Sequence, residues 1–424
     1  MTNKKKAYKL FETFVGAGGS HIGFKQAGFT SIYANDNEQT CLETLLLNNP
    51  ELSESFLDRR SIIDIDGKDL FKKLKVEKGE IDVFFGGIVC KGFSLAGERS
   101  PSDERNYFYH KQLELVGHFM PKISVIENVP GIKNAKVLSK DTPLEIKESV
   151  DRIWQNIENY KGEKANLRKL NKVTEEVELK GVKLRNKKTE IINFLENNGY
   201  LISVLDDIKI IYDEMGYNVS YEVLNTAWYG ASTKRERVVI VATRKDLKGE
   251  YKFPTPVYHS EEIKTKLFDS NHKSLSFKKP ISINHALKKI DYTNKEDVDN
   301  YPMNHNEKTV RRFKLIPPGD NISNHIENIP DDLKISKFYS RGNTMRLSGD
   351  KLSPTLVPGH SNFPVHPTEH RSITVREAAT ITGFPIDYKF IGSHSKRCEH
   401  VGNAVPPPLA KAIAESCIEF LNNQ

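Results

Sequence analysis

The strongest constraint on the fold is a short apolar run that ends in glycine and leads to a single cysteine. Residues 81–88 have the length and composition of a strand buried on both faces, and Cys90 follows with Lys91, Gly92 and Ser94. Strands of this kind occur in parallel sheets covered by helices, whose ligand crevice lies at the carboxyl ends of the strands. The run therefore predicts an α/β fold with the cysteine beside a crevice.

A second apolar run supplies the other side of this crevice. Residues 123–126 form it, and Glu127 and Asn128 follow directly. A free cysteine is more often a small buried hydrophobe than a reactive group. The glycines around Cys90 argue against core packing, and the charge of Lys91 would lower the thiol pKa from its usual value of about 8.5. We therefore expect a thiol and a carboxylate to face one crevice.

The first strand of the chain leads into a turn of glycines. Residues 8–15 have strand character, and 16–19 form a turn in which the backbone can approach a ligand at a helix N-terminus. Asp36 ends the next strand, 31–35, where a carboxylate can accept hydrogen bonds from ribose hydroxyls. It can also serve as the N-cap of the following helix. The spacing is not GxGxxG, so we predict a Rossmann-like half that binds an adenosine cofactor other than NAD.

Composition sets wider bounds. With 424 residues the chain is long enough for two domains. Its net charge of +7 is compatible with a polyanionic partner but also common in ordinary proteins. No apolar run reaches the roughly 18 residues of a membrane span, and we expect a soluble, intracellular protein. The four cysteines form no CxxC pair, so neither a disulfide framework nor a metal site is predicted.

Four regions can be separated along the chain. Residues 1–244 carry the α/β pattern and form the expected catalytic, cofactor-binding domain. Within it, 134–198 is rich in Lys, Glu, Leu and Asn, and we interpret it as one or two long solvated helices rather than a DNA-contacting arm. The prolines and asparagines of 245–390 predict a second, irregular domain with short strands. Residues 391–424 end in a helix that we expect to return to the first domain.

Two further motifs are a pair of arginines and the beginning of a helix. Arg235 and Arg237 stand two apart at the entry to a strand and project to the same side, where they could hold a ligand or form structural ion pairs. Thr374 and Glu377 have the spacing of a capping box at a helix N-terminus.

Taken in order, these motifs resemble those of DNA (cytosine-5) methyltransferases. The resemblance covers nearly the whole chain and implies S-adenosylmethionine as cofactor, no metal, and base flipping of a cytosine in duplex DNA. It implies that Cys90 adds to carbon 6 of the base, that Glu127 acts as an acid near N3, and that Arg237 holds O2. The matching blocks are 14–19, 90–94, 127–129, 235–237, 374–378 and 402–406.

The resemblance also assigns residues to the site. The catalytic set is Cys90, Glu127, Asn128, Arg235 and Arg237, with Arg235 bracing the closed catalytic loop. The DNA-contacting set is Lys91, Ser94, Thr355 and Leu356. The cofactor set is Phe14, Gly16, Ala17, Gly18, Gly19, Asp36, Asn37, Ser61, Ile62, Asn403 and Val405.

Two departures from the family pattern bear on activity. This chain has Ile88-Val89-Cys90-Lys91 where the family usually has Pro-Pro-Cys-Gln, and Thr233 where a glutamine precedes the arginine pair. Two alternatives follow: a non-catalytic DNA-binding relative, or an RNA (tRNA) cytosine-5 methyltransferase. Every ionisable catalytic residue is retained, which favours an active enzyme, and the sizeable region between Arg237 and Thr374 favours DNA over RNA as the substrate.

The resemblance extends to the setting of the enzyme. It implies a bacterial, cytoplasmic monomer that acts on DNA of the nucleoid. It further implies the modification half of a restriction-modification pair, with the cognate endonuclease encoded nearby.

Overall fold

The computed structural model describes residues 7–88, 100, 108–263, 276–335, 342–359 and 363–424. The described residues form a seven-stranded sheet in the order β3-β2-β1-β4-β5-β10-β8, in which β10 alone runs antiparallel to its neighbours. This confirms the predicted α/β, Rossmann-like fold. The strands are β1 (Tyr8–Thr13), β2 (Phe29–Asn35), β3 (Leu57–Asp58), β4 (Val83–Gly87), β5 (Ile123–Asn128), β8 (Tyr217–Asn225) and β10 (Glu236–Arg244).

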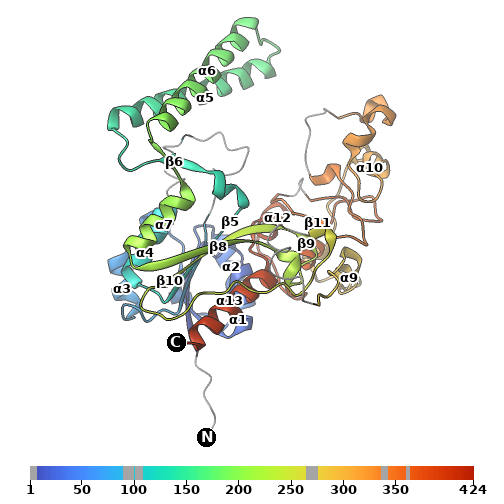
Figure 1. Cartoon of the computed structure of the whole chain (residues 1–424). Coiled ribbons are helices and arrows are strands. Elements are labelled where there is room, and N and C mark those ends of the chain that lie inside the picture. Colours follow the sequence, from blue (N-terminus) through green and yellow to red (C-terminus); the bar gives the residue numbers. More distant parts are fainter. Residues whose placement is uncertain (1–6, 89–99, 101–107, 264–275, 336–341, 360–362) are drawn as a thin grey trace.

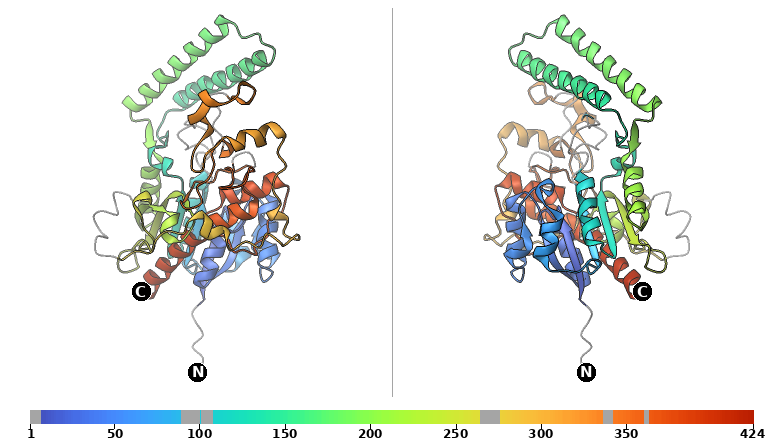
Figure 2. Two further views of the ribbon diagram at one scale, coloured as in Figure 1. Left: turned by 90° about the vertical axis from the view of Figure 1, so that its right-hand side faces the viewer. Right: turned by 90° about the vertical axis from the view of Figure 1, so that its left-hand side faces the viewer.

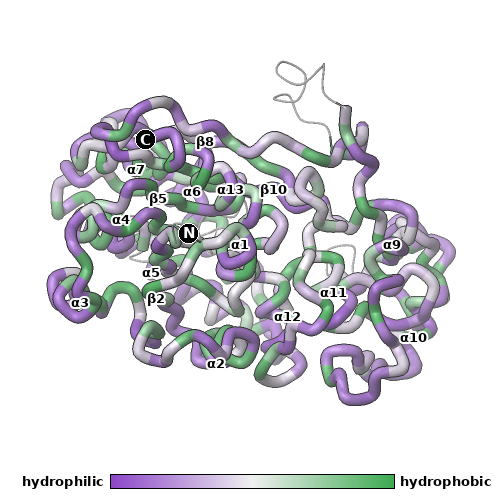
Figure 3. Tube along the Cα trace, turned by 90° about the horizontal axis from the view of Figure 1, so that it is seen from below, coloured by the Kyte–Doolittle hydropathy of each residue, from purple (hydrophilic) through white to green (hydrophobic). Residues whose placement is uncertain are grey.

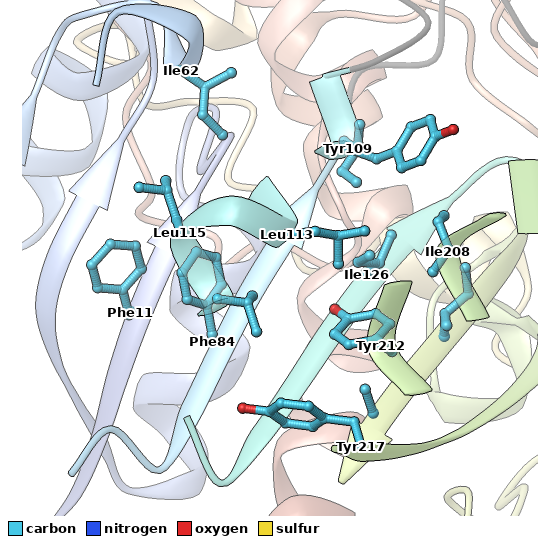
Figure 4. Close-up of a cluster of buried hydrophobic side chains, with 14 of the residues drawn as sticks. Phe11, Ile62, Phe84, Tyr109, Leu113, Leu115, Ile126, Ile208, Tyr212 and Tyr217 are labelled. Carbon is cyan, nitrogen blue, oxygen red and sulfur yellow. The ribbon is translucent and has the colours of Figure 1, made fainter. Parts of the chain in front are cut away.

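Helices cover both faces of the sheet, as the all-apolar strands require. Successive side chains of a strand point to opposite faces, so Phe84 packs on one side while Val83 and Phe85 pack on the other. The first face is covered by α3 (Gly67–Leu74), α4 (Phe108–Phe119) and α7 (Val204–Glu214), and Figure 4 shows its core of aromatic and aliphatic side chains. The second face is covered by α1 (Gly19–Ala27) and α13 (Pro407–Asn422).

The last helix, α13, packs against the first helix of the chain. Helices α1 and α13 lie side by side on this second face of the sheet (Figure 3). Leu409, Ile413 and Phe420 of α13 are buried in the same core as Phe24 of α1. The approach of the two helices is close because Gly23 has no side chain: a Cβ there would stand 2.4 Å from the backbone nitrogen of Lys411.

The 134–198 insertion is a helical hairpin that stands away from the sheet (Figures 1 and 2). Strands β6 (Lys136–Leu138) and β7 (Leu201–Ser203) pair at its base, and α5 (Leu144–Lys169) and α6 (Glu175–Asn197) form its arms. A small core of Val150, Trp154 and Leu195 joins the arms near the base. Among the described residues, no helix is long and apolar enough to cross a membrane.

Region 245–390 is irregular, but its described part holds mostly short helices instead of the short strands that we expected. The asparagines of this region start helices rather than bound strands. Asn306 caps α10 (Glu307–Lys314), and Asn321 caps the 3-10 helix η8 (Ile322–Asn328). The other elements are η6 (Glu261–Ile263), α9 (Ile283–Leu287), η7 (Val298–Asn300), η9 (Asp331–Leu333), η10 (Gly342–Thr344) and the two-residue strand β11 (Ser353–Pro354).

Contact with the first domain begins before the predicted boundary at residue 391. Helix α11 (Val375–Thr382) starts with the predicted capping box of Thr374 and Glu377. It packs in one core with Ala17 and Ile22 of the first domain. The Tyr388 hydroxyl also donates a hydrogen bond to the Ala17 carbonyl at 2.7 Å. Residues from about 373 onward therefore pack against the N-terminal part of the chain.

Candidate active site

A cavity of about 450 Å³ opens at the carboxyl ends of the parallel strands. Each of four strands delivers a residue to its wall: Phe14 follows β1, Asp36 follows β2, Ile88 follows β4, and Glu127 lies at the end of β5. Segments 355–358 and 396–405 close the other side. The cavity thus lies where the α/β pattern predicted the crevice.

The turn after β1 has the backbone of a ligand cradle. Gly16 and Gly18 adopt positive φ angles of 55° and 89°, which glycine tolerates without strain. Phe14 also has a positive φ, of 53°, and such strain in a non-glycine residue is characteristic of functional sites. A Cβ on Gly19 would stand 2.2 Å from the Val405 carbonyl oxygen. Gly18 and Gly19 therefore shape the turn, while Phe14, Gly16 and Ala17 line the cavity.

Asp36 is held in place by two backbone groups. Its carboxylate accepts hydrogen bonds from the N–H of Gly16 and of Glu38, each at 2.9 Å. Burial raises the pKa of the Asp36 carboxyl, and the two backbone hydrogen bonds oppose that rise. Helix α2 (Gln39–Asn48) has Glu38 as its N-cap, so the N-cap role considered for Asp36 is wrong. A carboxylate has about four acceptor positions, which leaves room for ligand hydroxyls.

The C-terminal segment supplies cavity residues that sequence reasoning missed. Lys396 of α12 (His394–Asn403) forms an ion pair with Glu38 at 2.8 Å. His400 Nδ1 lies 3.4 Å from Cys41 Sγ, and burial lowers the pKa of the imidazole. All four side chains line the cavity beside Asn403. His400 stands only two residues before the 402–406 motif, which was the one available signal.

Ser61 and Ile62 are not among the described residues that line the cavity. Ile62 is 2% exposed and packs in the core between the sheet and α4. Ser61 precedes the 3-10 helix η2 (Ile62–Asp64) as its N-cap. The structure therefore gives these two residues a place in the fold and no contact with the cavity, whereas Asn37, Asn403 and Val405 line it.

Glu127 and one arginine form a buried ion pair. Strand β10 runs antiparallel to β5, and this brings Arg237 Nε to 2.8 Å from Glu127 Oε1. Both side chains are more than nine-tenths buried. Burial lowers the pKa of the Arg237 guanidinium, and the negative charge of Glu127 opposes that effect. Asn128, next along β5, accepts a hydrogen bond from the Val129 N–H.

Arg235 faces the same cavity but contacts backbone rather than carboxylate. Its Nη1 donates hydrogen bonds to the Gly402 carbonyl at 2.7 Å and to the Leu356 carbonyl at 3.4 Å. Strand β9 (Thr233–Lys234) pairs with β11, which brings Thr355 and Leu356 to this place. Arg235 is buried, and both that burial and the nearby charge of Arg237 lower its pKa. It ties three distant parts of the chain together.

Among the predicted site residues, Cys90, Lys91 and Ser94 lie outside the described part of the chain. Ile88, two residues before the cysteine, lines the cavity, as do Thr355 and Leu356. The cavity therefore joins the glycine turn, the Glu127–Arg237 pair and the segment that leads to Cys90.

Comparisons with known proteins identify the family of the chain. The family model described as C-5 cytosine-specific DNA methylase matches residues 8–152 and 179–419. Type II methyltransferase M.Sau96I of Staphylococcus aureus is 28% identical over 99% of this chain and 77% of its own length. M.DdeI of Desulfomicrobium norvegicum is 26% identical over 98% and 89%.

A solved structure shows the same fold. A prophage-encoded protein of Escherichia coli superimposes with a TM-score of 0.59 and 20% identity, over 98% of this chain and 100% of the other. The family match covers most of the sequence and both sides of the cavity. The chain therefore belongs to the family of C-5 cytosine-specific DNA methylases.

Proposed function

We propose that this enzyme transfers a methyl group from S-adenosylmethionine to carbon 5 of one cytosine in a short duplex DNA site. The observation that carries the proposal is that the glycine turn with Asp36 and the buried Glu127–Arg237 pair share one cavity. One part suits an adenosine cofactor and the other suits a polar, flat base. Methyl donor and acceptor would thus meet at the carboxyl ends of β4 and β5.

The residues around the turn suit S-adenosylmethionine. Asp36 keeps acceptor positions for the ribose hydroxyls, and the helix α1 N-terminus has no side-chain cap, so its N–H groups remain available. Phe14 offers an aromatic face beside them. When bound, the cofactor supplies an electrophilic methyl group on a sulfonium.

Cys90 is proposed as the nucleophile. Its thiolate adds to carbon 6 of cytosine, and the electron pair of the 5,6 double bond moves toward N3 and carbon 5. Carbon 5 then takes the methyl group and loses its proton, and elimination of Cys90 restores the ring. Lys91 would favour the thiolate by its positive charge or contact a phosphate.

Glu127 and Arg237 would handle the polar edge of the base. Glu127, as the acid, would hydrogen-bond N3 and the exocyclic amine, which neutralises the charge that addition of the thiolate pushes onto N3. Arg237 would donate to O2, and it already lies 2.8 Å from Glu127. Asn128 follows Glu127 and would help to shape this edge of the cavity.

The base must leave the duplex to reach this cavity, at a cost of a few kcal/mol. Thr355 and Leu356 line the same cavity as Glu127 and would contact the flipped nucleotide. We assign sequence recognition to region 245–390, which contains these two residues. We assign bracing of the closed site to Arg235.

Bisulfite sequencing tests the proposal directly. Unmethylated genomic DNA is incubated with S-adenosylmethionine and either wild-type protein or Cys90→Ala, and unmodified tRNA is treated in parallel. We expect protected cytosines in one short DNA motif, with wild type only. Equal protection by both proteins would reject Cys90 as nucleophile. Protection of tRNA alone would move the enzyme to the RNA branch considered above.

The setting of the enzyme is also proposed. We propose a modification enzyme with a cognate endonuclease encoded nearby, acting as a monomer on DNA in the bacterial cytoplasm. The names of the relatives, type II methyltransferases, support the modification role. Light scattering would test the monomer. Failure of the host to cut unmethylated DNA that carries the motif would reject the pairing.

A further inference from the structure

The helical hairpin carries its charge unevenly. Residues 160–189, which we name the basic tip, contain ten Lys and Arg against four Glu. The parts of α5 and α6 nearer the base, 144–159 and 190–197, contain two Lys and Arg against six Asp and Glu. An excess of six positive charges, close to the +7 of the whole chain, is therefore concentrated at the tip.

Five of these ten basic side chains line one groove. A depression of about 590 Å³ between the two helices is lined by Lys161, Lys164 and Arg168 from α5 and by Arg185 and Lys188 from α6. The helices meet closely beside it because Gly181 faces the buried Tyr160 ring, where a Cβ would stand 2.2 Å from the hydroxyl. The fold thus brings like charges from both arms together instead of spreading them over separate faces.

Part of this charge forms no direct ion pair, although Arg168 and Arg185 lie within the electrostatic reach of Glu178. Lys164 pairs with Glu178 at 2.6 Å, and the Lys188 ammonium lies 5.4 Å from the centre of the Trp154 ring. Arg168 and Arg185 are exposed, and neither forms an ion pair with another described residue. A face that only needed solubility would gain more from mixed charges, which repel each other less.

The base of the hairpin lies close in the chain to the carboxyl end of β5, where Glu127 lines the cavity. Its base follows the 3-10 helix η4 (Pro130–Asn134), which comes directly after the end of β5 and Glu127. Figure 1 shows the hairpin rising above the sheet on the same side as α10, with its free end directed toward the second domain. The family model does not match 153–178, so this part is an addition to the common methylase fold.

We propose that the basic tip binds the phosphates of duplex DNA that flanks the target site. The inference rests on the proposed function, because it assigns the tip to the same substrate. A helix of the length of α5, 26 residues, extends about 39 Å, comparable to one turn of B-DNA. Contact with phosphates adds affinity without sequence preference, and counterion release makes it strongly dependent on salt.

The test compares salt dependence among four full-length proteins. Binding to a 40-base-pair duplex of arbitrary sequence is measured by fluorescence anisotropy from 50 to 200 mM salt for wild type, Arg168→Gln/Arg185→Gln, Arg168→Lys/Arg185→Lys, and Lys72→Gln/Lys73→Gln. The last pair removes the same charge from the exposed end of α3. Circular dichroism and S-adenosylmethionine binding establish that each variant is folded.

The loss of two phosphate contacts should reduce the slope of log K against log salt by about 1.8, which is about 12-fold in affinity change over this range. The lysine pair and the α3 pair should keep the wild-type slope. A wild-type slope for Arg168→Gln/Arg185→Gln would overturn the inference and leave the tip to solvent or a protein partner. Methylation of genomic DNA by wild type, measured in parallel, reports the proposed function separately.

Discussion

Arg237 Nε lies 2.8 Å from Glu127 Oε1 because β10 places Val239 opposite Glu127 and directs the side chain of Arg237 into the cavity. The pair is buried, and removal of one partner from a buried pair leaves a charge without compensation. The two groups are therefore held together in the absence of a base. A flipped cytosine, whose N3 and O2 lie on one edge, would present that edge to both groups.

Glu127→Gln should lower kcat by about 10²–10⁴-fold, the usual contribution of a positioned acid or base. The amide keeps an oxygen that can accept from Arg237 but cannot deliver a proton to N3. We expect cofactor affinity to stay within about twofold, measured by calorimetry beside single-turnover methylation. Glu236→Gln, an exposed neighbour on β10, serves as the matched control. Full activity of Glu127→Gln would contradict the acid role.

Arg235→Leu should destabilise the enzyme by about 2–4 kcal/mol, because it leaves the Leu356 and Gly402 carbonyls buried without their donor. Arg235→Lys should recover part of this loss, since an ammonium can reach one carbonyl but lacks the planar fork. Urea unfolding with constant m-values measures both. If Arg235→Leu unfolds at the wild-type midpoint, the bracing role is lost and Arg235 must act on substrate instead.

The sheet and the position of the crevice could be predicted because both follow from local patterns. Largely apolar runs such as 83–85 and 123–126 require burial on both faces, and the glycines after the first run and Glu127 after the second mark the carboxyl edge. The capping box of Thr374 and Glu377 is equally local. These features depend on a few neighbouring residues, so sequence alone identifies them.

The contacts that complete the cavity could not be predicted because they join distant segments. Nothing in the sequence near Glu38 indicates that Lys396, more than 350 residues later, will pair with it. The burial of Ile62 could not be predicted for a related reason, since the short η2 helix turns this side chain into the core. The polarised charge of the hairpin was visible, but its groove required the two helices to be placed together.

Gly23→Ala should destabilise the fold by about 1–3 kcal/mol, the usual cost of overpacking. The new methyl group would stand 2.4 Å from the Lys411 nitrogen and 2.6 Å from Ala410 Cβ, and backbone atoms cannot move aside cheaply. Gly162→Ala on α5 is the matched control, because no heavy atom lies within 4 Å of its Cβ. That change should stabilise the hairpin by about 0.5–1 kcal/mol. Thermal unfolding of both variants separates packing from helix propensity, and equal effects would contradict the close α1–α13 contact.

Cofactor affinity should depend on pH through Asp36. Burial raises the pKa of its carboxyl above the ordinary 3.8, so as pH falls the folded protein takes up this proton before an exposed aspartate would. The charged form costs stability at neutral pH, and that cost is lost as pH falls through the raised pKa. Protonation removes acceptor capacity for ribose hydroxyls, so affinity for S-adenosylmethionine should decline while the fold persists.

Calorimetric titrations from pH 7.5 to about 4.5 should show this decline in wild type. Asp36→Asn should bind weakly, by about tenfold or more, with a flatter profile, because an amide does not titrate. Subtraction of the Asn profile removes contributions from Glu38 and His400, and identical profiles would exclude Asp36 as the ribose acceptor.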